Sequence, residues 1–350
     1  MRRLFASDIL MLKNIIDLRS DTVTRPSKAM YAAMSAAEVG DDCWGDDPTV
    51  LKLQAALAER TGKEAGLFFP SGTQCNLAGL MAHCTRGDEF IVGQEAHTYK
   101  WEGGGAAVLG SIQPHPIENA VDGSIPLDKI VDAIKPIDQH FARTRLLTLE
   151  NTIDGKVLPS DYVRNATALA REKGLVTHLD GARIFNASIF LEKPVYELCD
   201  GFDTISICCS KGLGAPVGSV LVGTKPIIDS AHRWRKVLGG GMRQAGILAA
   251  ACLYALDNNV ERLVDDHENA ARLATGLGQI DDIDIQSCAT NMVFFKIKQH
   301  HRLPLQAFLK ERGILTEILP SARLVTHRDI DAGQIDIVVN EVKRYFATCK

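Results

Sequence analysis

The first candidate for chemistry is Lys211, which follows a run of apolar residues predicted to form a buried strand, Thr204–Cys209. Burying an unpaired ammonium group is costly. The cost disappears if the amine is bound covalently as an imine, and Gly212 and Gly214 leave room for a flat ligand. A lysine whose stem covers apolar surface while its ammonium reaches water is the alternative. Small apolar neighbours make it the weaker interpretation.

A carboxylate, Asp180, stands thirty-one residues before Lys211 and follows the apolar segment Leu175–Leu179. At a strand end, a carboxylate can pair with a pyridinium nitrogen and keep the ring electron-withdrawing. Taken alone, Asp180 is about as well explained as a turn residue that caps the next element. The gap fits one helix and a return strand, so both side chains should emerge at one edge of a parallel sheet.

A candidate phosphate cradle, formed by Ser71, Gly72 and Thr73, follows the predicted strand Ala65–Phe69 and opens a helix. Gly72 allows close backbone approach, and the helix N-terminus offers free N–H groups and positive potential. Ser and Thr also make ordinary helix caps, which would usually be the better explanation. These three residues therefore indicate a phosphate site only in combination with the other candidate residues.

His97 follows the predicted strand Glu89–Val92. It could stack on an aromatic cofactor or act as a base, and a hydrogen-bonded loop histidine is the alternative. In chain order the candidates are a phosphate cradle, a histidine, an aspartate and a lysine. This order is the layout of fold-type I enzymes that use pyridoxal 5'-phosphate (PLP).

Short apolar strands that alternate with helices are expected to position these residues. Further strands are predicted at Leu146–Leu149 and Ser219–Val222, and helices at Thr73–Cys84 and Asp161–Lys173. This alternation predicts an α/β fold with a mostly parallel central sheet flanked by helices on both faces.

After about Arg243 the pattern changes to that of a small C-terminal α+β domain. The expected elements are helices at Gln244–Asn258, Val260–Leu277, Pro304–Arg312 and Ala332–Thr348, with strands at Asn291–Ile297 and near Arg323–His327. We therefore expect an N-terminal segment at residues 1–30, a large domain at 31–255 and a small domain at 256–350.

Composition favours a globular cytoplasmic protein. The 350 residues are 46% hydrophobic, which is ample for a sizeable core, and the net charge of −4 argues against nucleic-acid or membrane binding. The nine cysteines are odd in number and form no C-x-x-C pair, so reduced thiols are expected, with Cys208 and Cys209 in core packing. Residues 1–13 are interpreted as a variable extension, and Met11 is an alternative start.

No metal site is expected, because no group of His, Asp and Glu residues has ligand spacing in the sequence. The pair His300–His301 lies in a polar stretch and is interpreted as solvated.

Long motifs make the sequence similar to L-threonine aldolases of the low-specificity bacterial branch, from about Ile15 to the C-terminus. These motifs are Ile16–Pro26, Val39–Asp42, Gly45–Val50, Ile91–Gln94, His178–Asn186, Ser210–Gly218 and Gly239–Ala250. The resemblance implies a fold-type I PLP enzyme that cleaves L-threonine, L-allo-threonine and other β-hydroxy-α-amino acids to glycine and an aldehyde. It also implies a homotetramer with active sites at subunit interfaces.

The resemblance also implies roles for individual residues. Lys211 matches the lysine that carries PLP, Asp180 the partner of the ring nitrogen and Arg183 a ligand of the ring hydroxyl. Gly72 and Thr73 match phosphate binders, and His97 matches the stacking histidine. Basic residues that reach the phosphate region, partly across a subunit boundary, are matched by Lys236 and Arg243.

Ser20 and Arg323 match the residues that bind the substrate carboxylate, with Arg183 assisting. His140 resembles a second active-site histidine near the substrate hydroxyl. Two positions depart from the family pattern: Trp44 replaces a frequent Tyr, and Ile153 replaces a loop His. The aromatic wall survives at Trp44 without its hydroxyl, so the fine substrate preference is left open.

The carboxylate-binding residues are expected to decide the reaction, because they set which bond at Cα is aligned to break. Arg323 suits this task, since its planar fork gives two parallel, charge-assisted hydrogen bonds. His97, His140 or a water that they hold is the candidate base.

Two alternatives are kept. The first is β-elimination, transamination or racemisation on the same scaffold, against which the N-terminal signature speaks. The second is a PLP-binding regulatory or carrier protein. The sequence shows no added DNA-binding segment, and it has a matching residue at every catalytic position. Both points speak against the second alternative.

Overall fold

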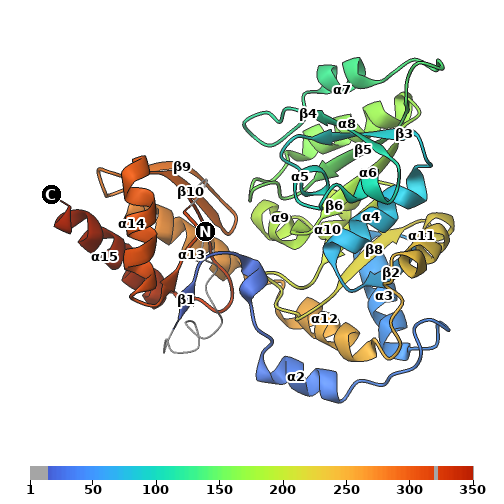
Figure 1. The fold of residues 1–350 in the computed structure, drawn as a ribbon. Helices are drawn as coiled ribbons and strands as arrows, with labels where there is room; N and C mark the ends of the chain where they lie inside the picture. The colour runs from blue at the N-terminus through green and yellow to red at the C-terminus, as the bar shows by residue number, and fades with distance from the viewer. Residues whose placement is uncertain (1–14, 319–321, 350) are drawn as a thin grey trace. The chain divides into compact units, whose positions relative to one another are not determined.

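The computed structural model describes residues 15–318 and 322–349, which fall into two compact units. The large unit is Arg25–Glu261, and the small unit joins the residues before it to those from Arg262 onward (Figure 1). Residues 15–24 belong to the small unit, whereas the sequence predicted a separate N-terminal segment at residues 1–30. The interpretation of residues 1–13 lies outside the described residues.

The large unit is built on a seven-stranded sheet with the order β2-β8-β7-β6-β5-β3-β4 (Figure 1). Only β8 runs antiparallel to its neighbours β2 and β7. The strands are β2 (Ala65–Phe69), β3 (Asp88–Gly93), β4 (Gln113–Ile117), β5 (Arg143–Glu150), β6 (Val176–Gly181), β7 (Thr204–Cys208) and β8 (Ser219–Gly223). The prediction of a mostly parallel α/β sheet is confirmed.

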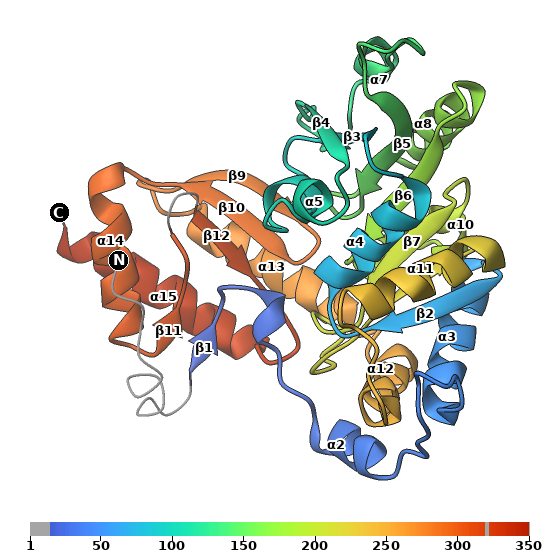
Figure 2. The ribbon, with the colours of Figure 1, turned by 45° about the vertical axis from the view of Figure 1, so that its right-hand side comes forward.

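Helices cover both faces of this sheet. On one face, α4 (Gly72–His83) packs beside α11 (Lys225–Val237), and on the other face lie α3 (Pro48–Thr61) and α8 (Ser160–Glu172) (Figure 2). The remaining helices of the unit are α2 (Lys28–Ser35), α5 (His97–Lys100), α6 (Gly105–Val108), α7 (Leu127–Ala133), α9 (Ile184–Leu191), α10 (Val195–Cys199) and α12 (Gly246–Asn258).

The central strands are buried on both faces of the sheet, which requires continuous apolar segments. All residues of β3, β7 and β8 are buried, which matches the unbroken apolar runs that predicted them. The strand β4 was not predicted. It contains Pro114 and Pro116, which cannot donate ladder hydrogen bonds, and the sheet accommodates it at an edge.

The register of the sheet places polar residues side by side at one edge. Glu150 at the end of β5 pairs with Asp180 on β6, and Asp180 pairs with Ser206 on β7. Ser219 opens β8 opposite both Phe69 and Cys208, so the antiparallel strand begins where its neighbours end. Side chains that follow these strands therefore gather at the carboxyl edge, where ligands bind in open α/β sheets.

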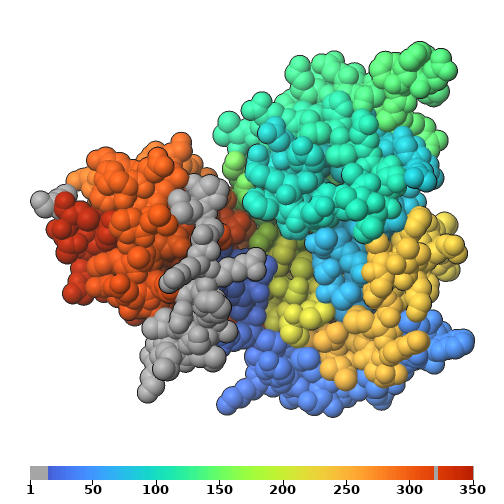
Figure 3. Space-filling model, in the orientation of Figure 1, coloured from blue at the N-terminus to red at the C-terminus, as the bar shows by residue number. Residues whose placement is uncertain are grey.

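The small unit has a three-stranded antiparallel sheet, β12-β10-β9, formed by β9 (Asp284–Ala289), β10 (Met292–Lys296) and β12 (Ala322–Val325). Its helices are α13 (Leu263–Leu277), α14 (Gln299–Lys310) and α15 (Ala332–Thr348). A parallel pair joins β1 (Ile16–Asp17) to β11 (Ile314–Leu315), and a short helix, η1 (Asp21–Val23), follows β1. Figure 3 shows the two units in space-filling form.

Two elements of the small unit differ from the sequence-based prediction. Pro304 was expected to begin a helix, as proline often does, but α14 begins at Gln299 and contains Pro304 within it. The strand β9 was missed because polar residues such as the exposed Gln286 and the half-exposed Ser287 interrupt its pattern. His301, expected to be solvated, is half-buried, with Nδ1 3.0 Å from the Tyr345 hydroxyl.

Within the described ranges, no helix combines the length and the apolar character that crossing a membrane requires. All nine cysteines are free. Cys209 is buried and Cys208 borders the site described next.

Candidate active site

A small hollow at the carboxyl edge of the large sheet brings together four of the predicted residues. Lys211, Asp180, His97 and Gly72 line it, and it holds about 230 Å³ of empty space, including space open to solvent. Asn76, Ala182, Ser206, Ile207, Cys208 and Ser219 complete the lining. The fold therefore assembles a lysine, a carboxylate, a histidine and a helix N-terminus around one space.

The anion-binding end of the hollow is the first turn of α4. The Ser71 hydroxyl caps this helix by accepting from the Gln74 amide at 3.2 Å, so the ordinary capping role holds for Ser71. Gly72 is the first residue of the helix, where N–H groups have no acceptor within the helix. A Cβ on Gly72 would lie 3.6 Å from the Ser219 hydroxyl, so glycine keeps this space open.

Ser219 supplies a polar atom that the sequence analysis missed. Its hydroxyl is buried and has no hydrogen-bond partner among the described residues. A buried hydroxyl without a partner is costly unless a ligand or water satisfies it. Together with the α4 N-terminus, the hydroxyl forms a site suited to the oxygen atoms of a phosphate group.

Asp180 is held by two hydrogen bonds. Its Oδ2 accepts from the Asn76 side-chain amide at 2.8 Å, and its Oδ1 accepts from the Ala182 backbone at 3.0 Å. The residue is 2% exposed. Each carboxylate oxygen can accept a further hydrogen bond, so Asp180 is able to bind a protonated ring nitrogen.

His97 is oriented by two acidic side chains. Its Nδ1 lies 2.8 Å from Glu102 Oε1, and its backbone N–H donates to Glu150 Oε2 at 2.6 Å. A carboxylate oxygen accepts, so Nδ1 carries the hydrogen and Nε2 of the neutral ring keeps its lone pair. Burial raises the pKa of Glu102, opposed by the hydrogen bond from His97.

Glu150 adds a titratable group to the site. Burial and, second, the charge of Asp180 raise its pKa to about 8, while Lys211 and Arg183 oppose the shift. These two cations are therefore close enough to Glu150 to act on it electrostatically. The strand β5 that carries Glu150 was predicted, but a glutamate at a strand end gave no distinctive signal of its own.

Three groups of types that bind metal ions meet at this site. Ligand atoms of His97, Glu102 and Asp180 lie within 4.8 Å of one another. The expectation of no metal site rested on sequence spacing, which does not reveal this grouping. The Asn76 amide donates to both carboxylates, to Glu102 at 2.9 Å and to Asp180 at 2.8 Å. The Asn76 amide thus donates to carboxylate oxygens that a metal ion would otherwise bind.

Three predicted residues lie together in a second hollow, of about 850 Å³ when space open to solvent is included, and do not line the first. Trp44, Lys236 and Arg243 line it. Trp44 is 83% exposed, and Arg243 pairs with Asp41 at 3.1 Å. The single chain therefore does not bring these residues to Lys211.

His140 and Ile153 also lie apart from the hollow around Lys211. His140 is exposed in the turn before β5, with Nδ1 2.6 Å from Asp138 Oδ1. Ile153 is buried, and its side chain packs over Gly123, where a Cβ would come within 2.3 Å of it. The residue that departs from the family pattern thus serves as packing in a turn.

The two predicted carboxylate-binding residues come together within the small unit. Arg323 on β12 donates from Nη2 to the Arg19 carbonyl at 3.4 Å, across 304 residues of sequence. Ser20 follows Arg19 and caps η1 by accepting from the Thr22 amide at 3.2 Å. The Arg323 guanidinium thus contacts the backbone of the residue that precedes Ser20.

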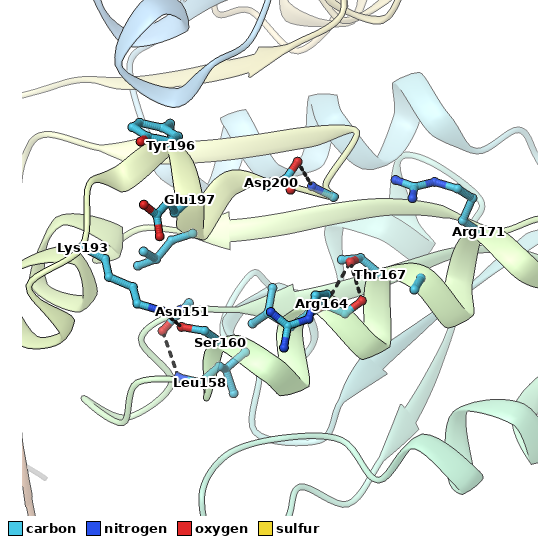
Figure 4. Close-up of a pocket in the computed structure, with 14 residues that line it drawn as sticks. Asn151, Leu158, Ser160, Arg164, Thr167, Arg171, Lys193, Tyr196, Glu197 and Asp200 are labelled. Atoms are coloured by element: carbon cyan, nitrogen blue, oxygen red, sulfur yellow. Dashed lines mark hydrogen bonds between the residues drawn. The ribbon is translucent and has the colours of Figure 1, made fainter.

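A larger cavity, of about 1310 Å³ when space open to solvent is included, lies elsewhere in the large unit, beside α8 and α10 (Figure 4). Arg164 and Arg171 come from α8, and Lys193 donates to the Ser160 hydroxyl at 3.1 Å (Figure 4). None of the four residues that identified the candidate site lines this cavity. The size of a cavity therefore does not identify the candidate active site of this protein.

The comparison with known proteins agrees with the site. Residues 17–300 match the family model described as Beta-eliminating lyase. The low specificity L-threonine aldolase of Escherichia coli strain K12 is 54% identical over 333 residues, covering 95% of this chain and all of the relative. The chain belongs to the low-specificity L-threonine aldolases within this family. A second member, low-specificity L-threonine aldolase 1 of Arabidopsis thaliana, is 44% identical over 93% of this chain and 94% of its own.

Solved structures support the fold. Threonine aldolase from Leishmania major superimposes with a TM-score of 0.80 at 20% identity, covering 94% of this chain and 99% of the other. Serine palmitoyltransferase from S. paucimobilis, solved with bound PLP–myriocin aldimine, gives 0.76 at 16% identity, covering 97% and 89%. The family and these neighbours confirm the fold-type I prediction.

The residues of the hollow fit PLP. The unpartnered Ser219 hydroxyl and the first turn of α4 suit its phosphate, and Asp180 suits its ring nitrogen. Lys211 lines the same space and offers the amine that an aldehyde requires.

Proposed function

We propose that this chain is a PLP-dependent aldehyde-lyase that cleaves L-threonine, L-allo-threonine and other β-hydroxy-α-amino acids to glycine and an aldehyde. The observation that carries the proposal is the hollow where Lys211, Asp180 and His97 meet the N-terminus of α4. The full-length similarity to low-specificity L-threonine aldolases supports the choice of reaction within the PLP enzymes.

When bound, PLP supplies an electron sink that stabilises negative charge at Cα of an amino acid. Lys211 would hold the cofactor aldehyde, Asp180 would keep the proton on the ring nitrogen, and Arg183 would donate to the ring hydroxyl. Ser71, Gly72 and Thr73 would bind the phosphate together with Ser219. His97 would provide the stacking side chain for the ring.

Arg323 and Ser20 bind the substrate carboxylate, with Arg183 assisting. Two parallel hydrogen bonds from a guanidinium group fix the angle at which Cα is held. That angle aligns the Cα–Cβ bond for cleavage. The reaction is thus chosen by the residues that orient the substrate, because the same cofactor supports several reactions.

His97 is also the candidate base for the β-hydroxyl proton, because Glu102 holds Nδ1 and leaves the lone pair on Nε2. His140 is exposed in the single chain. We therefore expect His140 to take part in the reaction only in an oligomer, where the active site is completed by the surface of a neighbouring subunit.

We further propose a cytoplasmic homotetramer in which one subunit completes the active site of another. The hollow that contains Trp44, Lys236 and Arg243 is exposed and basic, which suits the phosphate region of a partner's cofactor and a wall of its substrate pocket. Free cysteines are in keeping with a reducing compartment.

The function is tested with PLP-loaded protein and L-threonine, L-allo-threonine and L-serine. Acetaldehyde and glycine are expected from the first two substrates, and Lys211→Ala should remove nearly all turnover. Substantial aldolase activity in that variant would overturn the role of Lys211. Pyruvate and ammonia as the main products would favour β-elimination instead.

Shared sites are tested by mixing two inactive variants, Lys211→Ala and Lys236→Ala, under conditions that exchange subunits. Hybrid pairs that combine residues across a two-fold interface should restore roughly a quarter of the wild-type sites. Sedimentation should give a tetramer. No recovery despite proven exchange would place Lys236 outside the partner's site.

A further inference from the structure

The helix α4 presents two polar residues to the sheet that it covers. Asn76 and His83 are seven residues apart, so two helical turns bring them to one face. Gly79 lies between them, and a Cβ there would lie 3.1 Å from Cε1 of His178 on β6. Glycine therefore makes room for an imidazole beneath α4. The helix covers this part of the sheet (Figure 2).

The sheet presents matching residues to this face. Alternation along β6 turns His178 and Asp180 to the same side, and alternation along β7 does the same for Thr204 and Ser206. The register pairs His178 with Thr204 and Asp180 with Ser206. Polar side chains thus line a path beneath α4 that ends at the predicted partner of the cofactor ring.

Hydrogen bonds connect these residues into one chain. Nε2 of His83 lies 2.8 Å from the Thr204 hydroxyl, which lies 2.9 Å from Nδ1 of His178. Nε2 of His178 lies 3.2 Å from Oδ1 of Asn76, and the Asn76 amide donates to Asp180 at 2.8 Å. The Ser206 hydroxyl also donates to Asn76 Oδ1, at 2.5 Å.

The direction of every proton follows from the carboxylate at one end. The Asn76 NH₂ group must face Asp180 and Glu102, since its carbonyl oxygen would be repelled there. Its oxygen then faces His178, so Nε2 of His178 carries a hydrogen and Nδ1 accepts from the Thr204 hydroxyl. Thr204 in turn accepts from Nε2–H of His83.

Burial keeps this direction fixed. It lowers the pKa of His178 to about 3 and that of His83 to about 4, so both rings are neutral at neutral pH. A neutral ring that donates at one nitrogen accepts at the other. Every hydrogen bond in this series is therefore donated in the direction of Asp180.

We infer that His83, Thr204, His178 and Asn76 form a relay of positioning residues that holds Asp180 ionised against the ring nitrogen of the cofactor. Hydrogen bonds that donate to a carboxylate favour its charged form. Breaking the relay removes the His178 donor from Asn76 Oδ1, while the Ser206 hydroxyl and Glu102 still hold this amide. The hydrogen bond from Asn76 to Asp180 is then weaker, which favours movement of the proton from the ring nitrogen to Asp180. The inference rests on the proposed function and extends it to His83, Thr204 and His178, which do not line the hollow.

The test uses enzyme loaded with PLP labelled with ¹⁵N in its ring, together with kcat and KM for L-threonine. Thr204→Val removes the relay hydroxyl with little change in shape, and Thr204→Ser restores it. The matched control is Thr148→Val. Thr148 is equally buried, pairs with His178 from β5 and has no hydrogen-bond partner among the described residues. His178→Phe is a second way to break the chain.

The ring ¹⁵N signal of Thr204→Val and His178→Phe should move toward the unprotonated pyridine position. Loss of kcat should be about 3- to 30-fold, with KM changed less, because one or two hydrogen bonds are lost. Thr204→Ser and Thr148→Val should resemble wild type. An unchanged signal and kcat in Thr204→Val would overturn the relay. Wild-type enzyme that binds no PLP would instead overturn the proposed function.

Discussion

Nδ1 of His97 lies 2.8 Å from Oε1 of Glu102, and the same oxygen accepts from the Asn76 amide at 2.9 Å. One buried carboxylate oxygen therefore fixes both the tautomer of the candidate base and the amide that holds Asp180. The four residues between His97 and Glu102 include the whole of α5 after His97, so this short helix sets the geometry.

Replacing Glu102 should separate its role as an acceptor from its charge. Glu102→Leu removes the acceptor, and we expect kcat/KM to fall by roughly 100-fold, the size of a lost general base. Glu102→Gln keeps an oxygen toward His97 and should lose only a few-fold. Glu95→Gln, an exposed change in the same segment, is the control. Wild-type kcat/KM in Glu102→Leu would contradict the tautomer argument.

Ser219→Ala should weaken cofactor binding without destabilising the apoprotein. The hydroxyl is buried without a partner, so its removal costs the apoprotein no hydrogen bond. A hydrogen bond to a charged phosphate contributes about 1.5–3 kcal/mol, so the Kd for PLP should rise roughly 10- to 100-fold. Fluorescence titration with PLP measures it. Ser188→Ala removes a satisfied hydroxyl on α9 and should leave the Kd unchanged.

The sequence predicted most strands of the large unit because parallel strands are buried on both faces and read as apolar runs. Lys211, Asp180, His97 and Gly72 were found for a related reason. Each follows such a run, and strand ends meet at one edge. The edge strand β4 was not predicted, because its two prolines interrupt the apolar pattern of a strand.

Asn76, Glu102 and Ser219 could not be predicted, because their roles depend on contacts between distant segments. Asn76 lies 104 residues from Asp180, which it contacts. An asparagine on a helix is ordinary until the sheet beneath it is known. The division into units depends likewise on pairing between Ile16 and Ile314, which no local pattern reveals.

Arg323→Lys should act mainly on substrate binding. A lysine keeps the charge but loses the two parallel hydrogen bonds, so KM for L-threonine should rise about 10-fold or more. The looser hold on Cα should also increase side reactions, which pyruvate formation or loss of cofactor absorbance would reveal. Arg328→Lys, another half-buried arginine of the small unit, is the control. Equal KM values for wild type and Arg323→Lys would refute the carboxylate role.

The buried histidine of the relay should make stability depend on pH. The pKa of His178 is about 3 in the folded protein, against about 6.5 when unfolded, so the unfolded chain binds the extra proton between these values. Its contribution to the free energy of unfolding is thus fully present above pH 6.5 and lost as the pH falls toward 3. The slope is about 1.4 kcal/mol per pH unit.

Urea unfolding of the apoprotein between pH 4 and 6 measures this slope. In His178→Phe it should be shallower than in wild type by roughly that amount. Glu150 and Asp266, whose pKa values are raised to about 8 and about 6, act in the opposite direction. They are present in both proteins, so their effect cancels in the difference. Equal slopes in the two proteins would mean that His178 is not held neutral, and the fixed proton direction toward Asp180 would fail with it.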